Sequence, residues 1–244
     1  MIFVLSGEGP TDLGACNNAQ GSCTGDNFST GPMTVLIEQL AEHRIGFRLR
    51  DLPAQIHYLS ETSLCEKAKA LPNRLQPARG KKKLAETGYF YSNALALGVF
   101  ARALEDEEKD EAIAVLFRDC DGTRSARAGL WGGKWQSIAN GFANAQFERG
   151  VPMLPKPTSE AWLLSAAQAH PYQNAQDLED LPGNQASPNH PKKKLEQAFG
   201  TPKSRIELCE WLDETPFDSV RAAVMPSFKA FRDRLDEVVL SVMQ

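Results

Sequence analysis

The stretch Ala112-Ile-Ala-Val-Leu-Phe117 is an apolar hexamer with charged residues on both sides. In a chain that alternates strand and helix patterns, such a run predicts a central strand of a parallel sheet. Arg118 and then Asp119-Cys-Asp121-Gly-Thr-Arg124 follow it directly. Both aspartates therefore stand at the C-terminal end of a predicted central strand, which is where open α/β sheets place their sites.

The segments around the hexamer alternate in the same way. Ile2 to Leu5 is a short apolar run that ends in Ser6-Gly7-Glu8-Gly9-Pro10, which predicts a buried first strand and a tight turn. Further strands are predicted at 46–59, as one or two strands interrupted by Pro53, and at 151–154. Helical spacing predicts helices from residue 32 onward and at 94–107, 134–149, 158–169, 191–200, 205–213 and 226–243.

This order predicts an α/β fold with a mainly parallel sheet flanked by helices and a helical C-terminal part. We expect one α/β domain over residues 1–183, with a basic insertion at about 44–93. Residues 184–244 would form a helical extension packed on the same domain. The loop at 184–191 is assigned by its Asn, Ser and Pro content.

Composition places the chain among ordinary globular proteins. It has 244 residues, 42% of them hydrophobic, and a formal net charge of −4. No apolar run approaches the roughly 18 residues that a membrane helix needs, and the N-terminus lacks the pattern of a signal peptide. We therefore expect a soluble, cytoplasmic protein without a membrane partner.

The five cysteines are an odd number spread over a chain too large to need disulfides for stability. We expect all of them as free thiols. Cys16 and Cys23 lie in a loop rich in Gly, Asn and Ser, but no second ligand pair follows at zinc spacing. A structural zinc site is therefore not expected. The four tryptophans are expected in the core or facing a partner.

Asp119 and Asp121 are spaced so that an extended backbone directs both side chains to one face. Two carboxylates this close repel each other unless a cation or a proton lies between them. Their position after a buried strand favours a shared divalent cation. The alternative is an Asp-Gly turn in which Thr123 caps the next helix.

Two further acids follow predicted strands. Glu8 stands between Gly7 and Gly9, whose backbone freedom allows a sharp turn that leaves the carboxylate accessible. Glu160 follows the strand at 151–154 and opens the next helix, where the helix dipole alone would favour a carboxylate. Acidic residues at three strand ends are what a magnesium centre with oxygen ligands requires.

Positive charge is concentrated in two segments. Residues 44–93 hold ten Lys or Arg against four Asp or Glu, a local net charge of +6 that includes Lys81, Lys82 and Lys83. The second segment is Lys192 to Lys194. Such segments can bind a polyanion even when the whole chain is acidic, although a lysine triplet alone is typical of a solvated helix end.

Together, Gly7-Glu8-Gly-Pro-Thr-Asp12, Asp119-x-Asp121-Gly and Ser159-Glu160-Ala-Trp-Leu-Leu164 resemble the Toprim domain, which topoisomerases, primases and the OLD nucleases share. The chain looks most like a bacterial Toprim-like family of unknown function, over roughly residues 1 to 165. It departs from a minimal Toprim unit because 111 positions separate Glu8 from Asp119.

The resemblance implies a nuclease that hydrolyses phosphodiesters in nucleic acid with Mg²⁺ or Mn²⁺. Glu8 would be the general acid or base, Asp119 and Asp121 catalytic metal ligands, and Glu160 a third ligand. Contacts to nucleic-acid phosphates are assigned to Lys81, Lys82, Lys83, Arg124, Arg127 and Lys134. Relatives of this kind occur in phage-defence systems, which implies an SMC-like or AAA-type ATPase as a partner.

Two other functions are consistent with the same residues. Asp119-Cys-Asp121-Gly-Thr123 also resembles the nucleophile motif of haloacid-dehalogenase-type phosphatases, in which the first Asp forms an aspartyl-phosphate. In that family the motif lies near the N-terminus and a later acidic motif completes the metal site, and neither holds here. The other alternative is a non-catalytic subunit that binds a partner ATPase.

Overall fold

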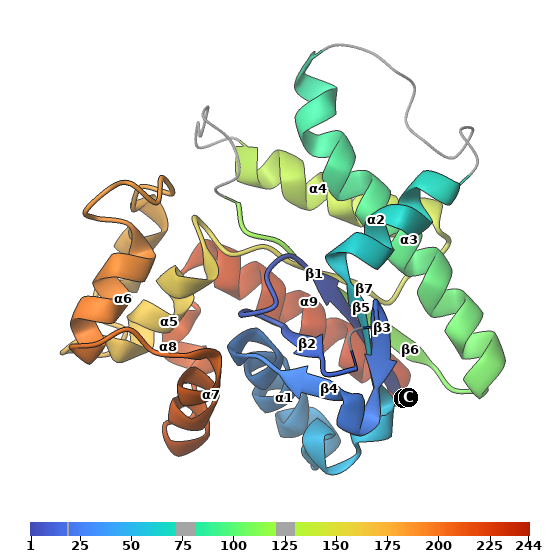
Figure 1. Cartoon of the computed structure of the whole chain (residues 1–244), viewed down its shortest axis with the longest axis horizontal. Helices are drawn as coiled ribbons and strands as arrows, with labels where there is room; N and C mark the ends of the chain where they lie inside the picture. Colours follow the sequence, from blue (N-terminus) through green and yellow to red (C-terminus); the bar gives the residue numbers. More distant parts are fainter. Residues whose placement is uncertain (19, 72–81, 121–129) are drawn as a thin grey trace.

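The computed structural model describes residues 1–18, 20–71, 82–120 and 130–244, with the backbone alone at 82–86. Within these ranges five strands form a central sheet in the order β3-β5-β1-β6-β7 (Figure 1). β5, β1, β6 and β7 run parallel, and β3 joins the edge antiparallel to β5. The strands are β1 Ile2–Gly7, β2 Gly14–Cys16, β3 Ser22–Thr24, β4 Phe28–Thr30, β5 Ile56–Ser60, β6 Ala112–Phe117 and β7 Gly150–Met153.

Helices connect and cover these strands. They are α1 Pro32–Ile45, α2 Glu61–Ala70, α3 Lys82–Glu108, α4 Leu130–Asn144, α5 Ser159–Ala167, α6 Pro191–Phe199, α7 Arg205–Glu214, α8 Ser219–Ala222 and α9 Pro226–Val242. Short 3₁₀ turns are η1 Gly25–Asn27, η2 Leu49–Asp51, η3 Pro53–Gln55 and η5 Ala175–Asp180. In the described part of the chain no helix is long and apolar enough to cross a membrane. The predicted α/β class with a mainly parallel sheet is confirmed.

The apolar hexamer is the central strand β6, as predicted. It pairs with β1 from Ile2 opposite Ala112 to Gly7 opposite Phe117, and with β7 on its other side. All six residues of β6 are buried. A strand covered on both faces needs apolar side chains at every position, which explains why the hexamer shows no alternation.

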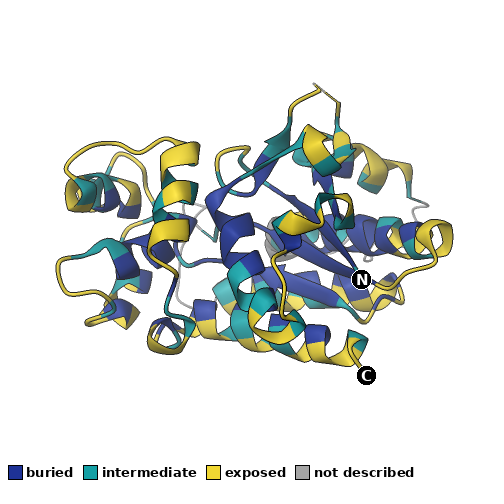
Figure 2. Ribbon diagram, turned by 90° about the horizontal axis from the view of Figure 1, so that it is seen from below, coloured by how far each residue is buried: buried dark blue, intermediate teal, exposed yellow. Residues whose placement is uncertain are grey.

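The two faces of the sheet are covered by different helices, and the strands between them are buried (Figure 2). Phe3 and Leu5 point to the face that α1, α5 and α9 cover. Val4 and Leu116 point to the opposite face, which α2, α3 and α4 cover. Alternate residues of β1 therefore belong to two hydrophobic clusters, as the twofold side-chain period of a strand requires.

The prediction of strands throughout 46–59 is wrong for its first part. Only Ile56–Ser60 forms a strand, and the preceding residues form the 3₁₀ turns η2 and η3. Pro53 starts η3 and has no N–H to donate to a ladder, which ends the extended pattern there. β5 pairs with β1, so the segment 44–93, predicted as an insertion, supplies one strand of the central sheet.

The predicted helix at 134–149 is displaced towards the N-terminus. α4 begins at Leu130 and ends at Asn144, five residues before the predicted end. Gln146 adopts a left-handed backbone conformation with φ of 54°. That conformation ends a helix and turns the chain into β7.

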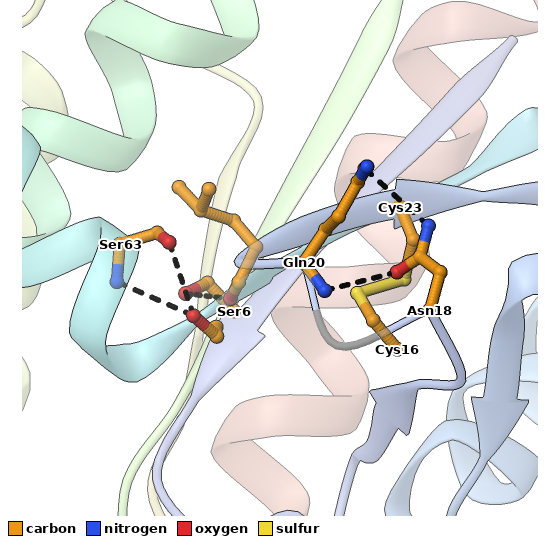
Figure 3. The surroundings of a disulfide bond; sticks show 8 residues. Ser6, Cys16, Asn18, Gln20, Cys23 and Ser63 are labelled. Carbon is orange, nitrogen blue, oxygen red and sulfur yellow. Dashed lines mark hydrogen bonds between the residues drawn. A yellow bond between two sulfur atoms is a disulfide. The ribbon is translucent and has the colours of Figure 1, made fainter.

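Cys16 and Cys23 form a disulfide, so the prediction of free thiols is wrong for these two residues (Figure 3). β2 and β3 bring their Cα atoms to 5.7 Å, within the range that a disulfide spans. The turn between them is held by Asn18, whose Oδ1 accepts a hydrogen bond from the backbone N–H of Gln20 at 3.1 Å. Cys65, Cys120 and Cys209 are not disulfide-bonded in the described part of the chain, as predicted.

A buried ion pair joins α1 to η2. The Glu38 side chain is 2% exposed, and its Oε2 lies 2.5 Å from Nε of Arg50. Arg50 also donates two hydrogen bonds to Asp213, at 2.7 and 2.6 Å. Burial raises the pKa of Glu38 from 4.5 to about 7, against the opposing attraction of Arg50.

We expect Glu38 to make the protein less stable as the pH rises from about 4.5 to about 7. Over that range the folded state holds a proton that the unfolded state has released, so the free energy of unfolding falls with pH. In Glu38→Gln the glutamine side chain cannot ionise, so the substitution should remove up to about 3 kcal/mol of this fall in the free energy of unfolding. Urea denaturation at several pH values measures it.

Glu42→Gln is the matched control, because Glu42 lies one turn further along α1 and its side chain is 39% exposed. It should keep the wild-type dependence of stability on pH. A Glu38→Gln variant with the wild-type dependence would show that Arg50 keeps this carboxylate ionised throughout the range.

Candidate functional site

The site lies where the strand order reverses. The chain passes from β1 to β5 on one side of β1, and then crosses to β6 on the other side. In open α/β sheets, ligands bind outside the carboxyl ends of the strands at such a switch point. Glu8 directly follows β1, and Arg118 and Asp119 directly follow β6.

Two glycines position Glu8. A Cβ on Gly7 would lie 2.3 Å from the carbonyl oxygen of Phe117, so only glycine allows β1 to approach β6 this closely. Gly9 has φ of 77°, and its carbonyl accepts a hydrogen bond from the Asp12 N–H at 3.2 Å. The predicted sharp turn is therefore present, with Glu8 between the two glycines.

The structure brings Glu8 and Asp119 together across 111 positions of sequence. Oε1 of Glu8 accepts a hydrogen bond from the backbone N–H of Asp119 at 2.5 Å. Oε2 accepts one from Nη1 of Arg118 at 3.0 Å. The Glu8 side chain remains 34% exposed, so it is fixed in place and still reachable from solvent.

Arg118 is a buried cation, 3% exposed, and several side chains hydrogen-bond to its guanidinium group. Besides Glu8, its Nη1 donates to Oε1 of Glu61 at 2.8 Å, and its Nη2 donates to the Tyr89 hydroxyl at 2.7 Å. Tyr89 in turn donates to Glu61 at 2.8 Å, and its ring centroid lies 4.4 Å from the guanidinium carbon. Burial raises the pKa of Tyr89 to about 12, so the phenol is a donor at neutral pH.

Ser159, the first residue of α5, links two acids. Its backbone N–H donates to Oδ1 of Asp119 at 2.9 Å, and its Oγ donates to Oδ1 of Asp12 at 2.5 Å. Burial, together with the nearby charges of Glu160 and Glu8, raises the pKa of Asp12 to about 6, against the opposing hydrogen bonds from Ser159 and Thr11. Carboxylates from the ends of β1, β6 and β7 thus converge on one edge of the sheet.

The sequence predicted that Lys134 contacts a nucleic-acid phosphate, but the structure buries this side chain completely. Its ammonium donates to the Cys120 carbonyl at 2.6 Å and lies 5.0 Å from the ring centroid of Phe90. The Cys120 N–H donates to the carbonyls of Pro155 and Pro157. Lys134 therefore supports the chain after Asp119 in this structure.

Asp121, predicted as a metal ligand, and the other residues predicted to contact nucleic acid lie where no side chain is described. Asp121, Arg124, Arg127 and Lys81 lie outside the described residues, and Lys82 and Lys83 open α3 in the part described by its backbone alone. Glu160, the second residue of α5, lines a cavity together with Asp12 and Ser159.

Carboxylate oxygens are the ligands that Mg²⁺ and Mn²⁺ prefer, so the donor chemistry of this edge fits a divalent cation. Among the residues described, no three His, Cys, Asp or Glu side chains gather closely enough to enclose an ion. A site on Asp119 therefore depends on Asp121, two positions along the chain.

From the sequence we did not single out Arg118, Glu61 or Tyr89, and we named Asp12 and Ser159 only as parts of motifs, without a role. Glu61 follows β5 and Ser159 follows β7, so both carried the strand-end signal that identified Glu8. Tyr89 lies inside α3 and carried no such signal. Its contact with Arg118 depends on how α3 packs over the sheet.

The fold and the site together define an α/β protein with an acidic centre at the switch point of its sheet. Comparison of the chain with protein-family models, with curated proteins and with solved structures found no match in any of the three.

Proposed function

We propose that this edge of the sheet is the active site of a divalent-cation-dependent phosphodiester hydrolase that acts on nucleic acid. The observation that supports it best is the contact between Glu8 and Asp119, which joins the two acidic motifs at the switch point. A fixed acid beside a metal-binding pair of aspartates is the combination that such hydrolysis needs.

Asp119 and Asp121 would hold Mg²⁺ or Mn²⁺. When bound, the ion supplies charge that stabilises the phosphoryl oxygens and the leaving oxygen. The N–H of Ser159 fixes the orientation of the Asp119 side chain through Oδ1. Ser159 thereby prepares Asp119 for binding, because a ligand that is already oriented loses little conformational freedom.

Glu8 is placed to move a proton. Each oxygen of a carboxylate has two acceptor positions, so the hydrogen bonds from Asp119 and Arg118 leave Glu8 able to take a proton from water or give one to the leaving oxygen. Arg118 and the Asp119 N–H hold the carboxylate in one orientation. A fixed orientation at hydrogen-bond reach is what general acid or base catalysis requires.

Nucleic acid is proposed as the substrate because of the basic segments. Residues 44–93 carry a local net charge of +6 in the sequence, but Arg44, Arg48 and Arg50 pair with acids outside the segment. The support therefore comes from the lysine-rich stretch at 79–83, because phosphate contacts dominate the affinity of proteins for nucleic acid. In this proposal Lys81, Lys82, Lys83, Arg124 and Arg127 contact the backbone phosphates. The ATPase partner and the role in phage defence stay predictions from the Toprim resemblance.

Purified protein incubated with single-stranded DNA, duplex DNA and single-stranded RNA tests the proposal. We expect cleavage with Mg²⁺ or Mn²⁺, loss of cleavage on addition of EDTA, and recovery when excess Mg²⁺ is restored. p-Nitrophenyl phosphate, a monoester, is the control substrate. Hydrolysis of the monoester without cleavage of any polynucleotide would contradict the proposal and favour the phosphatase.

A further inference from the structure

A cavity of about 180 Å³ opens beside the proposed active site. Asp12 and Ser159 form its wall on the side of the sheet, so the cavity and the acidic centre share two residues. Most of the remaining lining comes from α5, α6 and α7, which pack beside the carboxyl edge of the sheet (Figure 1), and the rest comes from Thr11, from Pro32 of α1 and from residues 203–204 before α7. A group bound in this cavity would lie next to the contact between Ser159 and Asp119.

One wall of the cavity is apolar. It is formed by Leu163 of α5, Leu195 and Phe199 of α6, and Leu208 of α7. The Phe199 ring is held in place by Trp211, with ring centroids 5.0 Å apart and the planes at 81°. An apolar wall that contains a fixed aromatic ring suits a flat ring system.

The rim of the cavity carries charges of both signs, because Glu160 and Glu196 line it together with Lys192, Lys203 and Arg205. Arg205 donates to the Pro10 carbonyl at 3.0 Å and to Ser29 Oγ at 2.7 Å, and Lys203 pairs with Glu207 at 3.3 Å. Lys192 is exposed, and among the described residues its ammonium has no hydrogen-bond or ion-pair partner. Lys192 is thus free to bind an anion at the mouth of the cavity.

We propose that this cavity binds one nucleoside phosphate unit of the substrate, with the base against Leu195 and Phe199 and a phosphate on Lys192. The proposal rests on the proposed function and names the substrate class of the same site. The volume is below the roughly 300 to 1,000 Å³ of pockets that enclose drug-sized ligands, so it admits one ring system. A stacked base pair would not enter, and the substrate unit is therefore an unpaired nucleotide.

Binding of AMP to the full-length protein in EDTA tests this without any hydrolysis. Isothermal titration should show that AMP binds more tightly than adenosine or ribose 5-phosphate, because each of these lacks one of the two contacts. Lys192→Gln should weaken AMP binding by roughly 10-fold, the usual effect of losing a charge-assisted hydrogen bond. Phe199→Ala should weaken AMP and adenosine alike.

Lys194→Gln is the matched control, since Lys194 lies on the same turn of α6 and does not line the cavity. It should bind AMP as the wild type does. Equal weakening by Lys192→Gln and Lys194→Gln, or no binding of AMP to the wild type at millimolar concentration, would overturn the inference. If the wild type cleaves polynucleotides but the AMP results overturn the inference, the proposed function still stands. If the wild type binds AMP as expected but cleaves no polynucleotide, the nucleotide-binding cavity is supported and the proposed phosphodiester hydrolase is contradicted.

Discussion

Glu8→Gln is expected to lower the rate of metal-dependent cleavage by roughly 10² to 10⁴ while the fold is kept. The amide cannot take up or release the proton that the carboxylate moves. Its oxygen can still accept the hydrogen bond from the Asp119 N–H, and the side chain is partly exposed, so the local structure should survive. Single-turnover cleavage, with circular dichroism as the check on folding, measures the effect.

Glu61→Gln is the matched control for this variant. Glu61 also binds Nη1 of Arg118 and is 41% exposed, but it makes no described contact with Asp119. If Glu8 acted only by balancing the charge of Arg118, both variants should lose activity equally. Near-equal losses would therefore contradict a role of Glu8 in proton transfer.

The phosphatase alternative assigns the covalent step to Asp119 and gives Glu8 no part in the reaction. Beryllium fluoride should then form an acyl-phosphate mimic on Asp119. We expect no such adduct. Full activity of Glu8→Gln together with a beryllium fluoride adduct on Asp119 would contradict the phosphodiester hydrolase and favour the phosphatase.

Trp162→Ala is expected to lower the free energy of unfolding by about 3 to 5 kcal/mol, the usual cost of removing a large core aromatic. Trp162 is fully buried, stacks on Phe231 at 5.6 Å and meets Phe228 edge to face at 5.2 Å. Its indole N–H donates to Ser227 Oγ at 2.9 Å. The variant would leave a cavity between α5 and α9 and remove this hydrogen bond.

Urea denaturation measures the loss, and Trp135→Ala is its control. Trp135 is only half-buried on α4 and stacks on Trp131 at 5.2 Å, so its removal should cost clearly less. Equal losses for the two variants would contradict the role of Trp162 as the residue that anchors α9 on α5.

The elements that sequence patterns located best are those whose environment is uniform. Ala112–Phe117 has both faces buried, so every position had to be apolar and the strand was visible without any partner. Glu8 and Asp119 followed from the rule that parallel strands end at one edge. Their contact confirms that the two motifs meet, while the likeness to Toprim stays a prediction.

The parts that sequence could not locate depend on distant partners. Arg118 borders the hexamer and would be expected in solvent, but it is buried because Glu8 after β1, Glu61 of α2 and Tyr89 of α3 pair with it. Lys134 is buried because the Cys120 carbonyl and the Phe90 ring receive its ammonium. Charge alone predicts exposure, whereas long-range pairing decides burial.

The disulfide was missed for a related reason. Cys16 and Cys23 are seven positions apart in a segment whose composition predicts a loop, and their approach depends on the strands β2 and β3. β2 pairs with β4, while β3 pairs with β5. Each of these pairings joins only three residues of each strand. Three residues are too few to show the alternating hydrophobic pattern by which a strand is recognised in a sequence.

The measurement that tests the central claim most directly is the anomalous difference map of crystals soaked in Mn²⁺. The proposed site requires a peak at about 2.0 to 2.2 Å from a carboxylate oxygen of Asp119, with Asp121 as the second ligand. The peak should be absent from crystals of Asp119→Asn. Asp177→Asn, an exposed aspartate of η5, should keep the peak. A peak that lies on Asp12 and Glu160 and persists in Asp119→Asn, or no peak at this edge of the sheet, would contradict the proposed site.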